Sequence, residues 1–495
     1  MTAQLTVVGI GADGYDGLGA TARQALTEAP LVVGSTRQLE LLPPAATAPD
    51  ARRLPWPSPL ERLLDELVTG RHGDAVVLAS GDPMLHGIGA SLARRIAAAG
   101  GAPAATDPAP APAATLRAIP HPSAFALACA RLGWPAADTE LLSTVARAPQ
   151  LVARSLQPGR RLVVYATGSD GAAQVARVLV ERGWGPSRFV VLEQLGGPRE
   201  RLIEATAAGW RERCADPLHA IAIETRAAPG TRALATTPGL PDDAFDHDGQ
   251  LTKRHVRAVT LAALAPLPGE LLWDVGAGNG SIAIEWLRAV VGTRAVAFEA
   301  NADRAVRIAA NASTLGVPEL RVVHGRAPEV LARELNGALD ASRGASDADR
   351  GASDADRGAP DADRGTPDAD RGTPDADRGT PGAARGTPDA DRGVPDADRG
   401  VPDAARPDAV FIGGGLTAPG LLDAAWAALR PGGRIVVNAV TLESQARLLE
   451  ARAAHGGSLT QVAIAHAEPV GSFSGWRQQM PVVQWEARKQ EEPEA

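Results

Sequence analysis

A glycine-rich turn in the second half of the chain has the residue types and spacing of a nucleoside-binding loop. The apolar run at residues 271–275 is followed at once by GAGNG at residues 276–280, and alternate glycines let a backbone turn tightly and approach a ligand closely. The next apolar run ends at Glu299, where a carboxylate can accept hydrogen bonds from both hydroxyls of a ribose. The alternative is a structural turn with an ordinary surface glutamate, but the order of runs, turn and terminal acid favours a nucleoside site.

The spacing of this turn also indicates which nucleoside it would bind. GxGxG directly after Asp274 is typical of Class I methyltransferases, which use S-adenosylmethionine, whereas dinucleotide folds favour GxGxxG. A later apolar run ends in FIGGG at residues 411–415, where methylases of amines often carry an Asn/Asp-Pro-Pro-aromatic clamp. Bare glycines there favour a bulky, flat substrate beside the sulfonium and argue against a base or amide nitrogen as the acceptor.

Three loops in the first half could enclose a second cofactor. VVGIGADG at residues 7–14, ASGDP at 79–83 and IPHPSA at 119–124 all lie where a strand would end, and loops at the carboxyl ends of strands form ligand crevices. The first loop alone could bind a dinucleotide, but no acid closes the next apolar run. For Asp82 the alternative is a turn-forming residue before proline, and for His121 it is a solvated loop residue.

Both sets of loops require α/β scaffolds. Apolar runs alternate with helical patterns along most of the chain, which is the signature of α/β architecture. We expect strands at residues 5–10, 31–34, 74–79, 161–165, 189–192 and 219–223, and then at 270–274, 294–298, 320–323, 408–412 and 434–438. A composition shift predicts a linker at 227–249 between domains at 1–226 and 250–490.

A seven-residue repeat interrupts the second domain at residues 343–406. An arginine recurs every seven residues, with Gly and Pro in nearly every unit and no apolar positions that could form a coiled coil. The tract holds ten Arg and fifteen Asp, which gives it a net charge of -5. Because this accounts for most of the chain's net charge of -8, the overall charge says nothing about a substrate. We interpret the tract as a disordered insertion: either an interaction tether or, more simply, a repeat expansion tolerated in a surface loop.

Composition excludes several classes of protein. At 495 residues with 44% hydrophobic residues the chain can form two or three cored domains. A net charge of -8 argues against nonspecific nucleic-acid binding. The first residues lack the basic start and the apolar run typical of a signal peptide, so none is expected. No stretch of 18 apolar residues occurs, so no membrane span is expected. The two cysteines form no CxxC pair, which favours a cytoplasmic location.

The second half resembles the decarboxylating precorrin C15-methyltransferase domain. The resemblance covers about residues 248–489 apart from the repeat, and rests on LTKRHVRA at 251–258, LWDVGAGNGSIAIEW at 272–286, HGRAPE at 324–329, FIGGG at 411–415 and PGGRIVVNAVTLE at 431–443. It implies a Class I Rossmann-like fold. It also implies that the cofactor contacts are Thr252, Gly276, Ala277, Gly278, Asn279, Gly280, Glu299 and Ala327.

The first half resembles the tetrapyrrole methylase family, specifically its precorrin C5-methyltransferase domain. The three loops and LACARLGW at 127–134 carry this resemblance, which covers about residues 5–224. It implies a two-lobed Class III α/β methylase. The residues that would line its cofactor cleft are Ala12, Ser80, Gly81, Asp82, Leu85, Ser123, Ala124 and Ala166.

The two domains fused in this order imply the precorrin-6B C5,15-methyltransferase (decarboxylating) family of cobalamin biosynthesis. S-adenosylmethionine would methylate C5 and C15 of a precorrin, and the C12 acetate would leave as carbon dioxide to give precorrin-8X. Because methyl transfer to carbon needs positioning more than acid–base help, no catalytic residue is assigned and no metal cluster is expected. Homo-oligomers are common in both relatives, so one is expected here. A cobalt-precorrin substrate and a non-catalytic, tetrapyrrole-binding first domain stay open, as does a nicotinamide oxidoreductase built on the two glycine loops.

A polycarboxylate substrate needs cationic anchors. Candidates are Lys253, Arg254 and Arg257 near the start of the second domain, and Arg477 near its end. We hypothesise that Arg254 or Arg477 holds acetate or propionate arms, with an ordinary solvated surface as the alternative for each cation.

Overall fold

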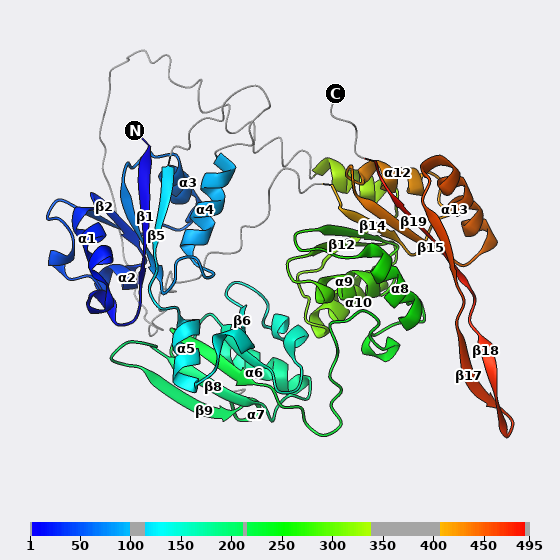
Figure 1. Cartoon of the computed structure of the whole chain (residues 1–495), viewed down its shortest axis with the longest axis horizontal. Helices are drawn as coiled ribbons and strands as arrows, with labels where there is room; N and C mark the ends of the chain where they lie inside the picture. Colours follow the sequence, from blue (N-terminus) through cyan, green and yellow to red (C-terminus); the bar gives the residue numbers. More distant parts are fainter. Residues whose placement is uncertain (1, 100–113, 211–214, 338–405, 491–495) are drawn as a thin grey trace, which may run out of the picture.

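The computed structural model describes residues 2–99, 114–210, 215–337 and 406–490. Within these ranges, the first half of the chain forms two five-stranded sheets, and the second half forms a seven-stranded sheet and a two-stranded ribbon. Figure 1 shows these halves as separate α/β units. The repeat at 343–406 lies outside the described residues apart from Arg406, so its interpretation stays a prediction.

The first sheet is parallel throughout, in the order β3-β2-β4-β1-β5. Its central strand β1 is a nearly continuous apolar run because both faces are covered: Leu5 and Val7 enter one buried cluster, and Val8 and Ile10 enter another. The elements of this lobe are β1 (Ala3–Ile10), α1 (Ala20–Glu28), β2 (Leu31–Gly34), α2 (Thr36–Glu40), β3 (Arg52–Pro55), α3 (Glu61–Val68), β4 (Ala75–Ser80), α4 (Ile88–Ala99) and β5 (Ala114–Ile119).

The second sheet is mixed, in the order β6-β7-β10-β8-β9, and only the β6–β7 pair is parallel. Its elements are α5 (Ala124–Leu132), β6 (Thr139–Ser143), β7 (Arg161–Tyr165), α6 (Gly171–Glu181), β8 (Arg188–Glu193), β9 (Arg201–Thr206), α7 (Ala207–Trp210) and β10 (His219–Glu224). The strand predictions in the first half correspond to β1, β2, β4, β7, β8 and β10. Strands β3, β5, β6 and β9 were not expected, because each lies at a sheet edge and carries polar, partly exposed side chains.

The third sheet has the order β13-β12-β11-β14-β15-β19-β16. Strands β13 to β15 are parallel, and β19 runs antiparallel between β15 and β16. The elements are α8 (Arg254–Leu264), β11 (Leu271–Val275), α9 (Ser281–Ala289), β12 (Arg294–Glu299), α10 (Ala302–Thr314), β13 (Arg321–His324), β14 (Ala409–Ile412), α12 (Leu421–Ala428), β15 (Arg434–Ala439), α13 (Leu442–His455), β16 (Ser458–Val462) and β19 (Val482–Arg488). The five strands predicted for this half correspond to β11 through β15.

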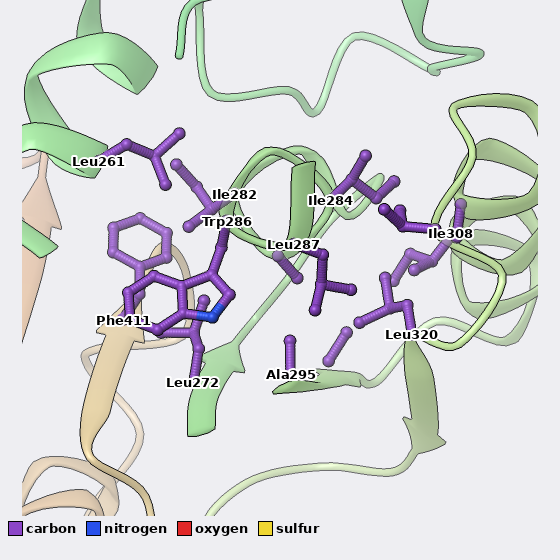
Figure 2. Close-up of a cluster of buried hydrophobic side chains, with 14 of the residues drawn as sticks. Leu261, Leu272, Ile282, Ile284, Trp286, Leu287, Ala295, Ile308, Leu320 and Phe411 are labelled. Carbon is purple, nitrogen blue, oxygen red and sulfur yellow. The ribbon is translucent and has the colours of Figure 1, made fainter. Parts of the chain in front are cut away.

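Helix α9, which follows the glycine turn, is buried from Ser281 to Arg288. Figure 2 shows Trp286 of α9 between Leu272 of β11 and Phe411 of β14, within an apolar cluster that also takes in Ile308 of α10. Full burial of one large apolar side chain contributes about 1.5–3 kcal/mol. This cluster therefore fixes the start of α9, and with it the glycine turn, on a rigid base.

Strands β17 (Ala465–Val470) and β18 (Phe473–Gln478) form an antiparallel arm that projects from the second domain in Figure 1. Large apolar side chains on and beside the arm are exposed: Phe473 and Trp476 at 80%, Met480 at 77% and Val470 at 62%. Such a cluster is unusual on the surface of a monomer and typical of an interaction site.

The segment at residues 239–245, which precedes α8, packs against the second domain. Leu240 and Phe245 belong to the cluster around α9, and Glu285 of α9 accepts backbone hydrogen bonds from Gly239 and Leu240. Arg257 of α8 is fully buried and donates to Glu285, Asp242 and the carbonyl oxygens of Thr252 and Leu240. The suggestion that Arg257 anchors substrate is therefore wrong, since its donors are used inside the protein.

Candidate active sites

The three loops predicted to enclose a cofactor in the first domain do meet. The Gly81 N–H donates to the Ile10 carbonyl oxygen at 3.0 Å. A Cβ on Gly9 would lie 2.7 Å from the His121 nitrogen, and one on Gly81 would lie 3.2 Å from the Ser123 Cα. Gly9 and Gly81 are thus needed because the neighbouring backbone lies too close for a side chain. The loops after β1, β4 and β5 therefore form one surface.

The middle loop is built by local hydrogen bonds. Asp82 Oδ1 accepts from the Met84 N–H at 2.8 Å, which is the turn-forming role considered above. Ser80 Oγ is 3.1 Å from donors of both Arg37 and Gln38, on the neighbouring helix α2. Leu85 follows in the same loop and is partly buried.

The second lobe contacts these loops through small residues and one tyrosine. A Cβ on Gly197 would be 2.7 Å from the Ala12 Cβ, so the first loop touches the second lobe. Ser123 Oγ caps α5, where Ala124 is the first residue, and Tyr165 Oη accepts from the Phe125 N–H at 2.8 Å. Burial raises the pKa of Tyr165 to about 12, so this hydroxyl stays protonated. Ala166, which follows Tyr165, is buried.

The first loop also takes part in a carboxylate–histidine contact that sequence reasoning missed. Asp13 Oδ2 is 3.1 Å from His121 Nε2, and the His121 side chain is only 9% exposed. His121 is therefore not a solvated loop residue. Asp13 Oδ1 is buried without a hydrogen-bond partner, beside a pocket of about 300 Å³ lined by His121 and the start of α1. The two residues lie 108 positions apart, so only the fold reveals the pair.

The glycine turn of the second domain has the conformation that its sequence predicts. Gly276, Gly278 and Gly280 have φ of +66°, +61° and +81°, a region that glycine adopts without steric cost. A Cβ on Gly276 would lie 2.8 Å from the carbonyl oxygen of Gly414 in the loop after β14. The turn therefore lies against the FIGGG loop at the carboxyl edge of the sheet, with Ala277 between two of its glycines.

Glu299 is placed to hold this turn. Its Oε2 accepts from the Gly278 N–H at 2.8 Å and its Oε1 from the Asn301 N–H at 2.9 Å, and the side chain is buried. The surface-glutamate alternative therefore does not describe Glu299. Ala327 follows β13 and is partly buried near the same edge.

A strap at residues 248–252 crosses the turn. Asn279 Nδ2 donates to the Gln250 carbonyl oxygen at 2.6 Å and to Asp248 Oδ1 at 3.1 Å. Hydrogen bonds from Arg304 and Asn279 hold the pKa of Asp248 well below its usual range. Thr252 ends the strap, and its carbonyl oxygen is held by Arg257. Thr252 and the glycine turn are thus neighbours, although sequence alone could only group them by resemblance.

A buried carboxyl at the end of β11 has an unused acceptor. Asp274 Oδ2 accepts from the Ala283 N–H at 3.0 Å, whereas Oδ1 is buried without a partner. Burial raises the pKa of Asp274 to about 7, with the charge of Glu299 adding to the effect. An unpaired carboxyl oxygen beside a glycine cradle fits a cationic nucleoside such as S-adenosylmethionine. Among the described residues, no three His, Cys, Asp or Glu side chains are grouped to hold a metal ion.

Comparison with known proteins identifies both halves. Residues 4–209 match the tetrapyrrole (corrin/porphyrin) methylase family, and residues 243–338 and 382–489 match the precorrin methyltransferase domain. A Precorrin-6Y C(5,15)-methyltransferase [decarboxylating] of Sinorhizobium sp. is 40% identical over 481 residues, covering 97% of this chain and 95% of that protein. The chain belongs to the precorrin-6Y C(5,15)-methyltransferase family.

Two further members of the precorrin-6Y C(5,15)-methyltransferase family match this chain. The Mycobacterium tuberculosis (strain CDC 1551 / Oshkosh) protein is 38% identical over 488 residues, covering 98% of this chain and 100% of that protein. The crystal structure of the C-terminal domain from Rhodobacter capsulatus is 36% identical and covers 52% of this chain and 100% of that domain, with a TM-score of 0.35. Family membership confirms the predicted fold: a tetrapyrrole methylase domain followed by a Rossmann-like methyltransferase domain.

Two predicted anchors of this family member lie outside the glycine turn. Arg254 Nε donates to the Gly239 carbonyl oxygen at 2.9 Å from an exposed side chain at the start of α8. Arg477 of β18 is 77% exposed and pairs with Glu468 at 3.0 Å.

In the part of the chain that the structure describes, no helix is long and apolar enough to cross a membrane.

Proposed function

We propose that the protein is a bifunctional decarboxylating C-methyltransferase of cobalamin biosynthesis, which uses S-adenosylmethionine. It methylates C5 and C15 of precorrin-6Y, named precorrin-6B above, and removes the C12 acetate as carbon dioxide to give precorrin-8X. The observation that carries this proposal is that two sets of strand-end loops are assembled on one chain, which we take as two cofactor crevices, together with near full-length relatives of that name. Because both full-length relatives above carry metal-free precorrin names, a metal-free substrate is favoured over its cobalt form.

The first crevice is assigned to C5 methylation. Its cofactor contacts are Ala12, Ser80, Gly81, Asp82, Leu85, Ser123, Ala124 and Ala166. The contacts among the loops after β1, β4 and β5 support this assignment, because they bring residues from three parts of the sequence to one surface. A complete loop set also argues against a first domain that only binds tetrapyrrole.

The second crevice is assigned to C15 methylation and decarboxylation. Its cofactor contacts are Thr252, Gly276, Ala277, Gly278, Asn279, Gly280, Glu299 and Ala327. Glu299, which holds Gly278, would accept hydrogen bonds from the ribose hydroxyls, and the unpaired oxygen of Asp274 would favour the positive charge of the cofactor. A Cβ on Gly415, in the glycine loop after β14, would meet nothing within 4 Å, which supports space there for a flat macrocycle.

The proposed reactions require the protein mainly to position the cofactor and the macrocycle. S-adenosylmethionine supplies an electrophilic methyl group when bound, and the conjugated macrocycle supplies the nucleophilic carbon. Holding the cofactor and the macrocycle in one crevice replaces a bimolecular encounter, and this positioning is the main source of the rate enhancement. Decarboxylation needs an electron sink, which the protonated macrocycle provides.

Arg254 and Arg477 are proposed as anchors for the acetate or propionate arms. Both are exposed guanidinium groups of the second domain, and Arg477 stands opposite His466 in the β17–β18 register. A surface ion pair such as Arg477–Glu468 contributes little, so Arg477 can exchange its partner for a substrate carboxylate.

We also infer domain boundaries, assembly and location. The methylase domain spans 1–226, the linker 227–249 and the second domain 250–490, with the repeat inserted at 343–406. The exposed apolar side chains of the arm support a homo-oligomer. A free, buried thiol at Cys129 supports a cytoplasmic location.

Mass spectrometry of the products tests the proposed function. The purified full-length protein is given S-adenosylmethionine with metal-free precorrin-6Y and, in parallel, with its cobalt form. We expect two methyl additions and loss of carbon dioxide with the metal-free substrate. A product with one methyl only would contradict the role of one domain, and turnover of the cobalt form alone would contradict the substrate assignment.

A further inference from the structure

A pocket opens where three segments of the second half meet. Its volume is about 270 Å³, and its walls come from the end of the linker, the start of α8 and the base of the arm. Lys253, Arg254 and His255 line it from α8, and His466 and Gln479 line it from the arm. A pocket of this size holds one or two small polar groups but not a whole macrocycle.

The pocket lies at the edge of the sheet that carries the glycine turn. Ala439, at the carboxyl end of β15, pairs with Val483, and Val462, at the end of β16, pairs with Val482. The chain between β16 and β19, which forms the arm, therefore leaves the sheet at this edge. The start of α8 lies there too, because Gln250 touches the glycine turn three residues earlier.

The side chains around the pocket leave an excess of positive charge. Its two carboxylates are already used: Asp242 pairs with buried Arg257 at 3.1 Å, and Asp243 with Arg232 at 3.1 Å. On the arm, Glu468 pairs with Arg477. Among the described residues, Lys253 has no carboxylate partner.

Two histidines stand beside these cations. The His255 and His466 rings lie 5.6 Å apart between centroids, with their planes at 41°. They come from α8 and β17, and they stand beside Lys253 and Arg254. Cationic and imidazole donors gathered without a free carboxylate are a recognition surface for an external anion.

We propose that this pocket is the carboxylate-binding subsite for one acetate or propionate arm of the macrocycle, with Lys253, His255 and His466 as the donors. This inference rests on the proposed function, and it makes the base of the arm part of the substrate site. The macrocycle would then extend from the pocket across the glycine loops at the same edge. Backbone N–H groups of the first turn of α8 add to the attraction for an anion.

The test measures binding of precorrin-6Y to the full-length protein saturated with S-adenosylhomocysteine, followed by tryptophan fluorescence, and the KM for precorrin-6Y in C15 methylation. The variants are Lys253→Gln and the double variant His255→Gln/His466→Gln. Loss of one hydrogen bond to a charged group weakens binding by about 10-fold or more. We expect that increase in Kd and KM, with kcat nearly unchanged and an unaltered affinity for S-adenosylhomocysteine.

Two control variants separate this subsite from general charge or folding effects. Lys253→Arg keeps the positive charge, and its Kd should stay within about 3-fold of wild type, because one donor geometry is replaced by another. Arg447→Gln removes an exposed cation that pairs with Glu450 on α13, and should change neither constant.

The possible outcomes distinguish the subsite from the proposed function. Lys253→Gln and the double histidine variant with the Kd of wild type would overturn the subsite, whether or not the enzyme turns over. A wild-type protein that binds precorrin-6Y but does not methylate C15 would overturn the proposed function, and the Kd values of the variants would still decide the subsite. A wild-type protein that binds no precorrin overturns both.

Discussion

Glu299 Oε2 accepts a hydrogen bond from the Gly278 N–H at 2.8 Å, so the acid that ends β12 holds the glycine turn that follows β11. One carboxylate oxygen thereby shapes the cofactor loop, and the other accepts from the Asn301 N–H. The geometry of this loop thus depends on a single side chain, which is also the proposed ribose ligand.

Glu299→Gln should weaken S-adenosylhomocysteine binding at the second domain by about 10-fold or more, because a charge-assisted hydrogen bond contributes roughly 1.5–3 kcal/mol. Titration calorimetry of the full-length protein should show two sites in the wild type. In the variant, one site should keep its affinity. Two unaltered sites would contradict the role of Glu299.

Gly276→Ala should abolish measurable binding at the same site. The new Cβ would lie 2.8 Å from the Gly414 carbonyl oxygen, at a φ of +66°. Gly420→Ala is the matched control, because Gly420 has a φ of +73° but nothing within 4 Å of its Cβ position. The control should lose only about 1–2 kcal/mol of stability and keep its affinity. Equal affinities in the two variants would show that close packing of the turn is unimportant.

Asp274→Asn should change how the stability of the second domain depends on pH. Burial raises the pKa of Asp274 to about 7 in the folded state, against about 3.9 in an unfolded chain. The unfolded wild type therefore loses this proton first, and wild-type stability falls as pH rises from 4 through 7.

Asparagine cannot ionise, so the melting temperature of Asp274→Asn should rise relative to that of wild type over this interval and level off above it. Differential scanning calorimetry of the ligand-free protein at several pH values measures the difference. A difference that is constant from pH 4 to 8 would show that Asp274 ionises normally.

Glu285→Gln should destabilise the second domain by about 3–5 kcal/mol, since removal of one partner leaves a buried charge uncompensated. The remaining partner is Arg257, which is fully buried. Glu450→Gln breaks an exposed pair on α13 and should cost less than about 1 kcal/mol. Thermal unfolding of both variants checks this contrast, and similar losses would contradict it.

Phe473→Ser/Trp476→Ser should reduce the molecular mass measured by light scattering, because both side chains are 80% exposed on the arm. Leu442→Ser, at a site 78% exposed on α13, should leave the mass unchanged. If the double variant and wild type have the same mass, the arm does not mediate assembly.

Local sequence was sufficient to predict the glycine turn, Glu299 and the central strands. A buried parallel strand must be apolar along its whole length, and the turn after β11 needs glycine at positive φ. Both requirements act on neighbouring residues, so they are visible in the sequence. Edge strands such as β9 were missed because one exposed side relaxes the same requirement.

Side-chain partners were decided by the tertiary structure. Arg254 and Arg257 are three residues apart on one side of α8 and look alike in sequence. Arg254 stands exposed at the first residue of the helix, whereas Arg257, one turn later, is buried against Glu285 of α9. His255 and His466 meet only because α8 and the arm leave the sheet at the same edge. Sequence determines which segments form strands, helices and glycine turns, whereas contacts between distant segments depend on how the sheet places them in space.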